Sequence, residues 1–444
     1  MKNRTNSRVF FWSIIVALGG FLFGFDTAVI SGVEKHIQEL FQLSSFMHGF
    51  TISSALIGTV TGALISGRPA DRYVRKPILF LIAGLYVVTA IGSALSNNLS
   101  SFIIFRFFGG IGIGASSVVG PTYIAEISPA KIRGRMTALF QFNVIFGIMI
   151  AYVSNYFLRD VGSEPWRFML GVAGIPSFIF FSLLFLIPES PRYLIKIGKI
   201  AIAKLILEKI EVSSIDEEIE EIRLSMMKGE NNKQPLFSRV YFKPISIAFL
   251  VAMFNQFSGI NAILYYAPRI FELSGLSNSD SLFQSILIGI TNSIFTMVGL
   301  VLIDRVGRKI LLISGSIGMS ICLGLVARAF YTNEFSGYGL LVFLLLYIVF
   351  FGFSTGAVIW VLIAEIFPNR VRGKGQSLGS FTHWFFAALI TFLFPVVAKT
   401  SHSGVGYGFM FFSVMMIIQA IVVWKYFPET KGITLEELGE KMSK

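Results

Sequence analysis

Charged residues, cysteine and histidine are all scarce in this chain of 444 residues. Charged residues make up 14% of it, whereas a soluble domain carries about a quarter. A single cysteine, Cys322, excludes an intramolecular disulfide and argues against a thiolate metal site. The spacing of the four histidines matches neither a metal site nor a nucleophile–base pair, so an enzyme is disfavoured. These histidines are His36, His48, His383 and His402.

Long apolar segments make up most of the chain. Hydrophobic residues make up 54% of the chain, phenylalanine supplies 46 residues, and the mean hydropathy is +0.72. An α-helix needs about 20 apolar residues to cross ~30 Å of hydrocarbon, and the blocks reach that length. The first block is too long for a cleaved signal peptide. We predict about twelve transmembrane helices, near 9–32, 46–66, 77–96, 102–127, 136–158, 168–187, 245–272, 282–303, 310–331, 338–366, 375–398 and 405–427.

The net charge of +12 is unevenly distributed among the loops. Basic residues gather in 68–76, 131–135 and 305–309, whereas the short loops 97–101 and 332–337 carry no lysine or arginine. Cytoplasmic loops of membrane proteins show this excess. The pattern predicts cytoplasmic termini. It also argues against nucleic-acid binding, because no basic stripe lies on a soluble domain.

Short charged signatures recur half a chain apart. Gly67–Lys76 is echoed by Asp304–Lys309, Ala125–Gly134 by Ala364–Gly373, and Pro188–Pro191 by Pro428–Lys431. A membrane chain built as two similar halves suggests a central site that faces each side in turn, as in a transporter. The predicted domains are two six-helix bundles at 1–191 and 244–427, a cytoplasmic linker at 192–243 and a tail at 428–444.

The linker contains a segment with helical periodicity. Ile215, Ile219 and Ile222 follow the i, i+4, i+7 spacing of one helix face, and acidic residues occupy the others. We interpret it as a water-facing helix that braces the two halves. A regulatory or calmodulin-type helix is less favoured because its polar face is acidic.

The ordered set of signatures resembles the sugar porters of the major facilitator superfamily. Besides the repeated loops, it includes Pro188–Arg192, Gln256 with Ser258–Asn261, and Pro428–Gly432, so the match spans nearly the whole chain. The resemblance implies an all-α membrane protein with the major facilitator fold. About twelve transmembrane helices would form two pseudo-symmetric six-helix bundles around a sugar site, working by alternating access.

Several amides and aromatic residues fall in the middle of their predicted spans. Buried amides are costly at membrane depth unless they are paired, and a sugar needs paired donors and acceptors plus an apolar surface. The alternative is amide bonding between helices, and for Asn292 the two interpretations are equally balanced. By resemblance and depth, the candidate substrate-binding residues are Gln141, Asn255, Gln256, Asn261, Asn292, Trp360, His383 and Trp384.

The seventh block carries a candidate helix break. Gln256 and Asn261 would point about 140° apart on an intact helix, and unwinding at Gly259 would bring them to one face. Tyr265 and Tyr266 follow as a candidate gate, with interfacial belt residues as the alternative.

Three positions depart from the pattern of the family. Asn255 stands where relatives have glutamine, Gly356-Ala357 replaces a Gly-Pro pair, and His383 replaces an amide. These changes leave the identity of the sugar open. A lone helical histidine is more often a packing or hydrogen-bonding residue, which is our interpretation of His383.

Proton coupling is assigned to one carboxylate. Asp26 lies inside the first block, where an ionisable group indicates function, and Arg106 lies at a similar depth in the fourth block. In the family, an aspartate at this position accompanies proton symport. Conformation would switch proton affinity because burial and the arginine act on the carboxyl group in opposite directions. The alternative is a static ion pair.

The charged loops also predict a latch at the cytoplasmic ends of the helices. Arginine–carboxylate bonds are directional and strong enough to bias two conformations. In the family such pairs stabilise the outward-facing state. The candidate latch residues are Arg72, Glu126, Arg133, Arg305, Glu365 and Arg372.

We therefore expect a proton-coupled symporter that imports a pentose or hexose. Alternatives are a passive uniporter, an inositol–proton symporter and a non-transporting sugar sensor, although a sensor usually carries a long cytoplasmic extension. No cofactor and no metal are predicted. The expected partners are the sugar, the proton and the lipid bilayer of a bacterial inner membrane, with the monomer as the functional unit.

Overall fold

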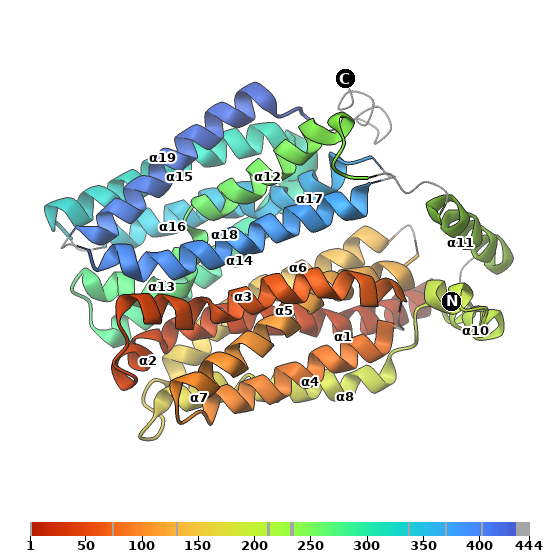
Figure 1. Cartoon of the computed structure of the whole chain (residues 1–444), viewed down its shortest axis with the longest axis horizontal. Helices are drawn as coiled ribbons and strands as arrows, with labels where there is room; N and C mark the ends of the chain where they lie inside the picture. Colours follow the sequence, from red (N-terminus) through yellow and green to blue (C-terminus); the bar gives the residue numbers. More distant parts are fainter. Residues whose placement is uncertain are drawn as a thin grey trace. The chain divides into compact units, whose positions relative to one another are not determined.

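The computed structural model describes residues 2–72, 75–129, 132–210, 214–230, 235–335, 338–368, 371–400 and 403–431. It describes their side chains except those of 2–6, 67–72 and 225–230. Every regular element in these ranges is a helix (Figure 1). The predicted all-α fold class is confirmed.

Twelve helical segments within the described ranges are long and apolar enough to cross a membrane, as predicted. Eight are single helices: α1 (Lys2–Val29), α3 (Ser45–Arg72), α4 (Arg75–Ala94), α5 (Leu99–Ile127), α6 (Arg133–Leu158), α14 (Asn278–Val306), α15 (Arg308–Thr332) and α18 (Arg372–Ala398). A ninth is α19 (Gly404–Tyr426).

The remaining three spans are interrupted. The sixth is α7 (Pro165–Gly171), α8 (Gly174–Leu183) and η2 (Leu184–Leu186). The seventh is α12 (Phe242–Phe257) and α13 (Ile260–Leu273), preceded by η3 (Arg239–Tyr241). The tenth is α16 (Gly339–Phe351), η4 (Gly352–Gly356) and α17 (Ala357–Glu365). The shorter elements are η1 (Ile30–Gly32), α2 (Glu34–Leu40), α9 (Pro191–Lys196), α10 (Ile200–Lys209) and α11 (Ile215–Glu230).

The chain forms two compact units. Unit 1 comprises Met1–Asp26, Gly58–Ile148 and Leu170–Gln234. Unit 2 comprises Thr27–Ile57, Met149–Met169 and Pro235–Lys444. Unit 2 therefore combines the second half of the sequence with two segments of the first half.

The core of unit 1 extends from the membrane spans into the linker. α4 packs against α5 and α8 (Figure 1). α9 packs against α10. Ile219 and Ile222 of α11 are 5% and 3% exposed within this core, whereas Glu217 and Glu220 face solvent. The predicted amphipathic helix is confirmed.

In unit 2, α15 packs along α19 and α12 packs along α18 (Figure 1). Its helix breaks have local causes. Gly259 separates α12 from α13 with φ +84°, a conformation that glycine adopts without strain. η4 is a five-residue π-helix, an irregularity that often marks functional sites. The tenth span is thus irregular without the Gly-Pro pair of the family.

Candidate functional site

The break in the seventh span brings its amides together. Asn255 and Gln256 end α12, and Asn261 begins α13. Gln256 Nε2 donates to Asn255 Oδ1 at 2.9 Å, and Asn261 Nδ2 donates to Gln256 Oε1 at 2.7 Å. All three side chains are buried. The predicted unwinding at Gly259 is confirmed, since an unbroken helix would separate Gln256 from Asn261.

Aromatic rings from two other helices adjoin these amides. His383 of α18 lies against Gln256, whose Nε2 is 3.1 Å from Nδ1 and 3.2 Å from Nε2 of the imidazole. The ring centroids of Trp360 and Trp384 lie 4.9 Å and 4.8 Å from that of His383. We call these six residues the amide cluster: Asn255, Gln256, Asn261, Trp360, His383 and Trp384. It places amide donors and acceptors beside an imidazole that contacts two indole rings.

Two predicted sugar-binding residues are not tied to the cluster by a described contact. Asn292 of α14 is buried and accepts a long hydrogen bond from Thr296 of its own helix, at 3.4 Å. Gln141 of α6 is half-buried and belongs to unit 1.

Two of the three departures, Asn255 and His383, have identifiable contacts. Asn255 Nδ2 donates to the carbonyl of Thr355, in the π-helix, at 3.4 Å. The irregular backbone of the tenth span therefore meets the shortened amide of α12. His383 contacts Gln256 and two tryptophan rings, which agrees with our interpretation of a packing and hydrogen-bonding residue.

The two tyrosines proposed as a gate are buried in the protein. Tyr265 and Tyr266 are 2% and 0% exposed, which disfavours the interfacial alternative. Tyr266 donates from its hydroxyl to the carbonyl of Thr391 in α18, at 2.9 Å. α13 is thereby attached to α18 beyond the amide cluster.

Prolines explain why tyrosine hydroxyls bond to backbone here. Pro395 has no N–H to give the carbonyl of Thr391, and Pro268 has none to give that of Leu264. Tyr152 donates to Leu264 at 2.7 Å, as Tyr266 does to Thr391. Both unpaired carbonyls are therefore satisfied, as membrane depth requires.

The ion pair proposed for coupling is present in unit 1. Arg106 Nη1 lies 2.5 Å from Asp26 Oδ1, with the arginine side chain 3% exposed and the aspartate 25%. The pair lines a cavity of about 20 Å³ with the hydroxyl-bearing residues Thr89, Ser93 and Ser177. A polar cavity of this size accommodates one water molecule beside the carboxylate.

A charged network closes one end of unit 1. Glu126 binds Arg75, with Nη2–Oε1 at 3.0 Å, and accepts from Ser190 Oγ at 2.6 Å. Glu189 accepts from the backbone N–H of Lys76 at the beginning of α4. Burial raises the pKa of the Glu189 carboxyl, against the opposing effect of backbone hydrogen bonds from Ser190, Lys76 and Arg75.

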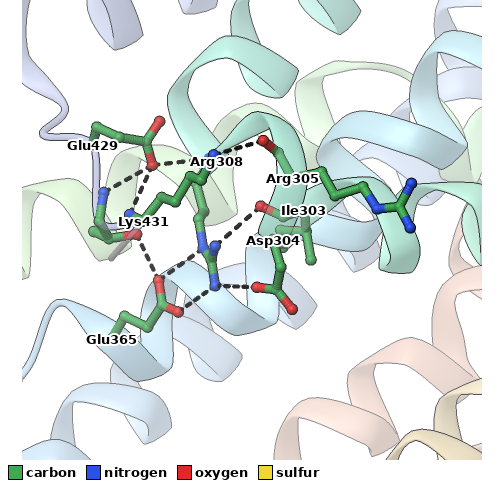
Figure 2. A network of polar contacts seen from close by, with 8 residues as sticks. Ile303, Asp304, Arg305, Arg308, Glu365, Glu429 and Lys431 are labelled. Atoms are coloured by element: carbon green, nitrogen blue, oxygen red, sulfur yellow. Dashed lines mark hydrogen bonds and ion pairs between the residues drawn. The ribbon is translucent and has the colours of Figure 1, made fainter. Parts of the chain in front are cut away.

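A matching network is found in unit 2 (Figure 2). Glu365 binds Arg308, with Nη2–Oε1 at 2.7 Å, and accepts from Thr430 Oγ1 at 2.6 Å. Glu429 accepts from the backbone N–H groups of Arg308 and Lys309 at 3.0 and 3.1 Å, and so caps α15. The two signatures Pro188-Glu-Ser and Pro428-Glu-Thr thus cap equivalent helices.

The predicted latch residues make different kinds of contact in the structure. Glu126 and Glu365 bind arginines, but these are Arg75 and Arg308, which our sequence reasoning missed. Their spacing was the available signal, since each follows the signature aspartate by four positions. The others are distributed as follows: Arg133 donates to the Ser128 carbonyl, Arg372 to the Phe367 carbonyl, the Arg305 carbonyl accepts from Lys431, and the side chain of Arg72 lies outside the described set.

Comparison with known proteins now identifies the family. A model of the family described as "Sugar (and other) transporter" matches residues 12–442. The chain belongs to the sugar transporter family. The predictions of a sugar porter and of a transporter in place of an enzyme are confirmed by this membership.

Several members of the family are similar over nearly their full length. The chain is 35% identical to the D-xylose-proton symporter of Escherichia coli, over 98% of this chain and 95% of that one. It is 38% identical to the arabinose-proton symporter of Bacillus subtilis, over 96% and 93%. A partially occluded inward-open structure of the E. coli xylose transporter XylE matches with a TM-score of 0.86 at 34% identity, over 96% of this chain and 100% of that one. A structure of that proton:xylose symporter, a protein of the major facilitator superfamily, matches with a TM-score of 0.83 at 35% identity, over 99% of this chain and 100% of that one. The predicted major facilitator fold is confirmed.

Proposed function

We propose that this chain imports a monosaccharide together with a proton by alternating access across a bacterial inner membrane. The observation that carries the proposal is the Asp26–Arg106 pair, a carboxylate held by a buried guanidinium on another helix. The relatives named as xylose-proton and arabinose-proton symporters support the same coupling. We infer from the charge of the loops that both termini are cytoplasmic, and we propose the monomer as the functional unit.

In this proposal the amide cluster binds the sugar. Its amides currently bond to one another, so sugar hydroxyls replace existing hydrogen bonds without leaving a buried polar group unpaired. Trp360 and Trp384 cover the apolar face of the ring. Gln141 and Asn292 contribute further donors from their own helices.

Proton transfer to Asp26 changes the charge of a buried pair. The protonated carboxyl no longer attracts Arg106, so the contact between α1 and α5 loosens. Loss of the proton restores the pair. A charge that is compensated in only one conformation couples proton binding to that conformation.

The networks around Glu126 and Glu365 act as the cytoplasmic latch of the proposal. Each network fixes helix ends within its own unit. Each six-helix half of the sequence can then move as a body while its charged end stays intact. The bundles at 1–191 and 244–427 with their linker remain our proposed domains.

The experiment uses sealed proteoliposomes that hold a pH-sensitive dye. Xylose, arabinose, glucose, galactose or inositol is added outside to wild type and to Asp26→Asn. We expect one of these sugars to acidify the interior in wild type. Asp26→Asn should exchange that sugar without acidification. A matched control, Asp160→Asn, removes a carboxylate whose side chain is 81% exposed and should behave as wild type.

Three other outcomes contradict parts of the proposal. Sugar exchange without acidification in wild type identifies a uniporter and makes the role of Asp26 wrong. Acidification with inositol alone replaces the monosaccharide by a polyol. No exchange with any sugar, in protein that is folded and inserted, favours a sensor.

A further inference from the structure

A second buried charge cluster lies in unit 2, on residues that neither the amide cluster nor the Asp26 pair includes. Glu34 opens α2, and its side chain is 1% exposed. Arg269 of α13 reaches it with Nη1–Oε2 at 3.0 Å and also donates to Gln38 Oε1 at 2.6 Å. A carboxylate this deeply buried depends on its partners, because losing one leaves an uncompensated charge.

An imidazole lies on the same carboxylate oxygen. His48, in the first turn of α3, is 0% exposed, and its Nε2 is 2.8 Å from Glu34 Oε2. The angles miss hydrogen-bond alignment, and Nδ1 has no partner among the described residues. The ring meets Tyr266 edge-on, with centroids 6.0 Å apart. Glu34 is thus shared between a permanent cation and a titratable group.

The cluster connects the two halves of the sequence inside one unit. Glu34 and His48 belong to the first half, and Arg269 to the second. Beside His48, α3 approaches α18 so closely that a Cβ on Gly49 would lie 2.1 Å from the Phe392 carbonyl. Tyr266, whose ring meets that of His48 edge-on, donates a hydrogen bond to Thr391 of α18. In the topology proposed above, this is the outer side of the protein.

We propose that Glu34, His48 and Arg269 form a pH-sensitive outer lock, which holds the outer ends of the first half against α13. The proposal rests on the transport function and deepens it by adding a proton-responsive element besides Asp26. Uptake of a proton by His48 gives Glu34 two cations and tightens the lock. Loss of that proton leaves Arg269 alone to hold it, so the outer side opens more readily.

The charges around His48 determine this direction. α2 contributes Glu34 and Lys35, and α13 contributes Tyr266, Arg269 and Glu272. Lys35 and Glu272 compensate each other at 2.7 Å. From α18, Thr391 contacts Tyr266 and Phe392 lies against Gly49, and both of these residues are uncharged. His48 Nε2 and Arg269 Nη1 both lie on Glu34 Oε2, so a proton on the imidazole places a second cation against this carboxylate.

The test measures how readily the outer side opens, with no sugar present. Ser31 is 3% exposed in η1, so Ser31→Cys in a Cys322→Ser background reports opening by its labelling with a membrane-impermeant maleimide. Each rate is divided by that of Glu334→Cys, an exposed position, which removes the pH dependence of the thiol itself. Between about pH 6 and pH 8 we expect the ratio to rise at least about fivefold.

Variants separate the lock from general packing. His48→Gln should give a ratio that does not change with pH, and Arg269→Gln a high ratio at every pH. Gly49→Ala should also raise the ratio while keeping its pH dependence, because it separates α3 from α18 without changing charge. The matched control is Lys35→Gln, which breaks the exposed ion pair between the same two helices and should leave the profile unchanged.

Three results would contradict the proposed lock. A pH profile that survives in His48→Gln, a ratio that rises with acid, or an equal effect of Lys35→Gln would each do so. Because labelling requires neither sugar nor a proton gradient, a failure of proton symport leaves this measurement interpretable. The converse also holds, since sugar-driven acidification in a His48→Gln protein keeps the assignment of Asp26.

Discussion

At the scale of single residues, the seventh and eleventh spans keep their prolines because tyrosines compensate for them. Pro268 and Pro395 each leave a carbonyl without an N–H donor, and a lipid environment supplies none. Tyr152 and Tyr266 provide the missing donors from neighbouring helices. These hydroxyls therefore fix where the broken helices contact one another.

This compensation predicts that mutations of the tyrosine and of the proline have non-additive effects on the free energy of unfolding. Tyr152→Phe should lower the free energy of unfolding by about 1 kcal/mol, since hydrogen bonds between membrane helices average about 0.6 kcal/mol and reach about 1.7 kcal/mol. In a Pro268→Ala background the helix regains its own N–H, so the same change should cost less than half as much. Unfolding of the purified protein in detergent measures the cycle. Equal costs in both backgrounds would show that the hydroxyl does not serve the proline gap.

At the scale of elements, the broken helix of the seventh span positions the amide cluster. Gly259 has φ +84°, and an added Cβ would lie 2.4 Å from the Phe412 ring of α19. The position thus requires glycine both for its backbone and for the close approach of α19. Asn261 reaches Gln256 only because of this break.

Gly259→Ala should therefore impair both stability and sugar binding. Gly198 is the matched control, because its φ of +77° imposes similar backbone strain while nothing lies within 4 Å of an added Cβ. We expect Gly198→Ala to cost about 1 kcal/mol, and Gly259→Ala to cost clearly more through the clash with Phe412. Binding measured by quenching of tryptophan fluorescence should weaken only in Gly259→Ala. Unchanged affinity in that variant would remove the amide cluster from the sugar site.

At the scale of the whole molecule, the repeat of the sequence and the compact units do not coincide. The charged networks follow the repeat, with Arg75–Glu126–Ser190 in unit 1 and Arg308–Glu365–Thr430 in unit 2. The unit boundaries do not, because Thr27–Ile57 packs with the second half. A contact that crosses the repeat inside one unit is the kind that alternating access must break.

A crosslink across such a contact should stop transport. Phe46 of α3 and Phe392 of α18 pack with ring centroids 5.1 Å apart. Joining cysteines at these positions, in a Cys322→Ser background, with a short cleavable reagent should abolish sugar uptake, and cleavage should restore it. The control pair Phe330 and Phe335 packs at 5.0 Å within the second half and should tolerate the same link. Uptake by the linked Phe46–Phe392 protein would mean that α3 and α18 need not separate.

Much of the architecture could be predicted because it depends on local properties. Each span is recognisable from about 20 consecutive apolar residues, and the break at Gly259 from a glycine between two amides. Asp26 and Arg106 could be paired because both helices start from known ends and rise by a constant amount per residue. The partners of Glu126 and Glu365 were harder to predict from the sequence. Several arginines of each loop lie within reach of the carboxylate, and only the packing of the helices selects one of them.

The sequence by itself determined the number of spans, the helical class, the family and the residues from which the amide cluster is made. These follow from hydropathy and from short signatures, which do not depend on the rest of the fold. Only the tertiary structure decided which side chains meet. Glu34, His48 and Arg269 are separated by up to 235 positions, and the sequence pattern gave no sign of a common site. The compensation of one buried charge by another depends on a few ångströms between helices, and no local pattern encodes that distance.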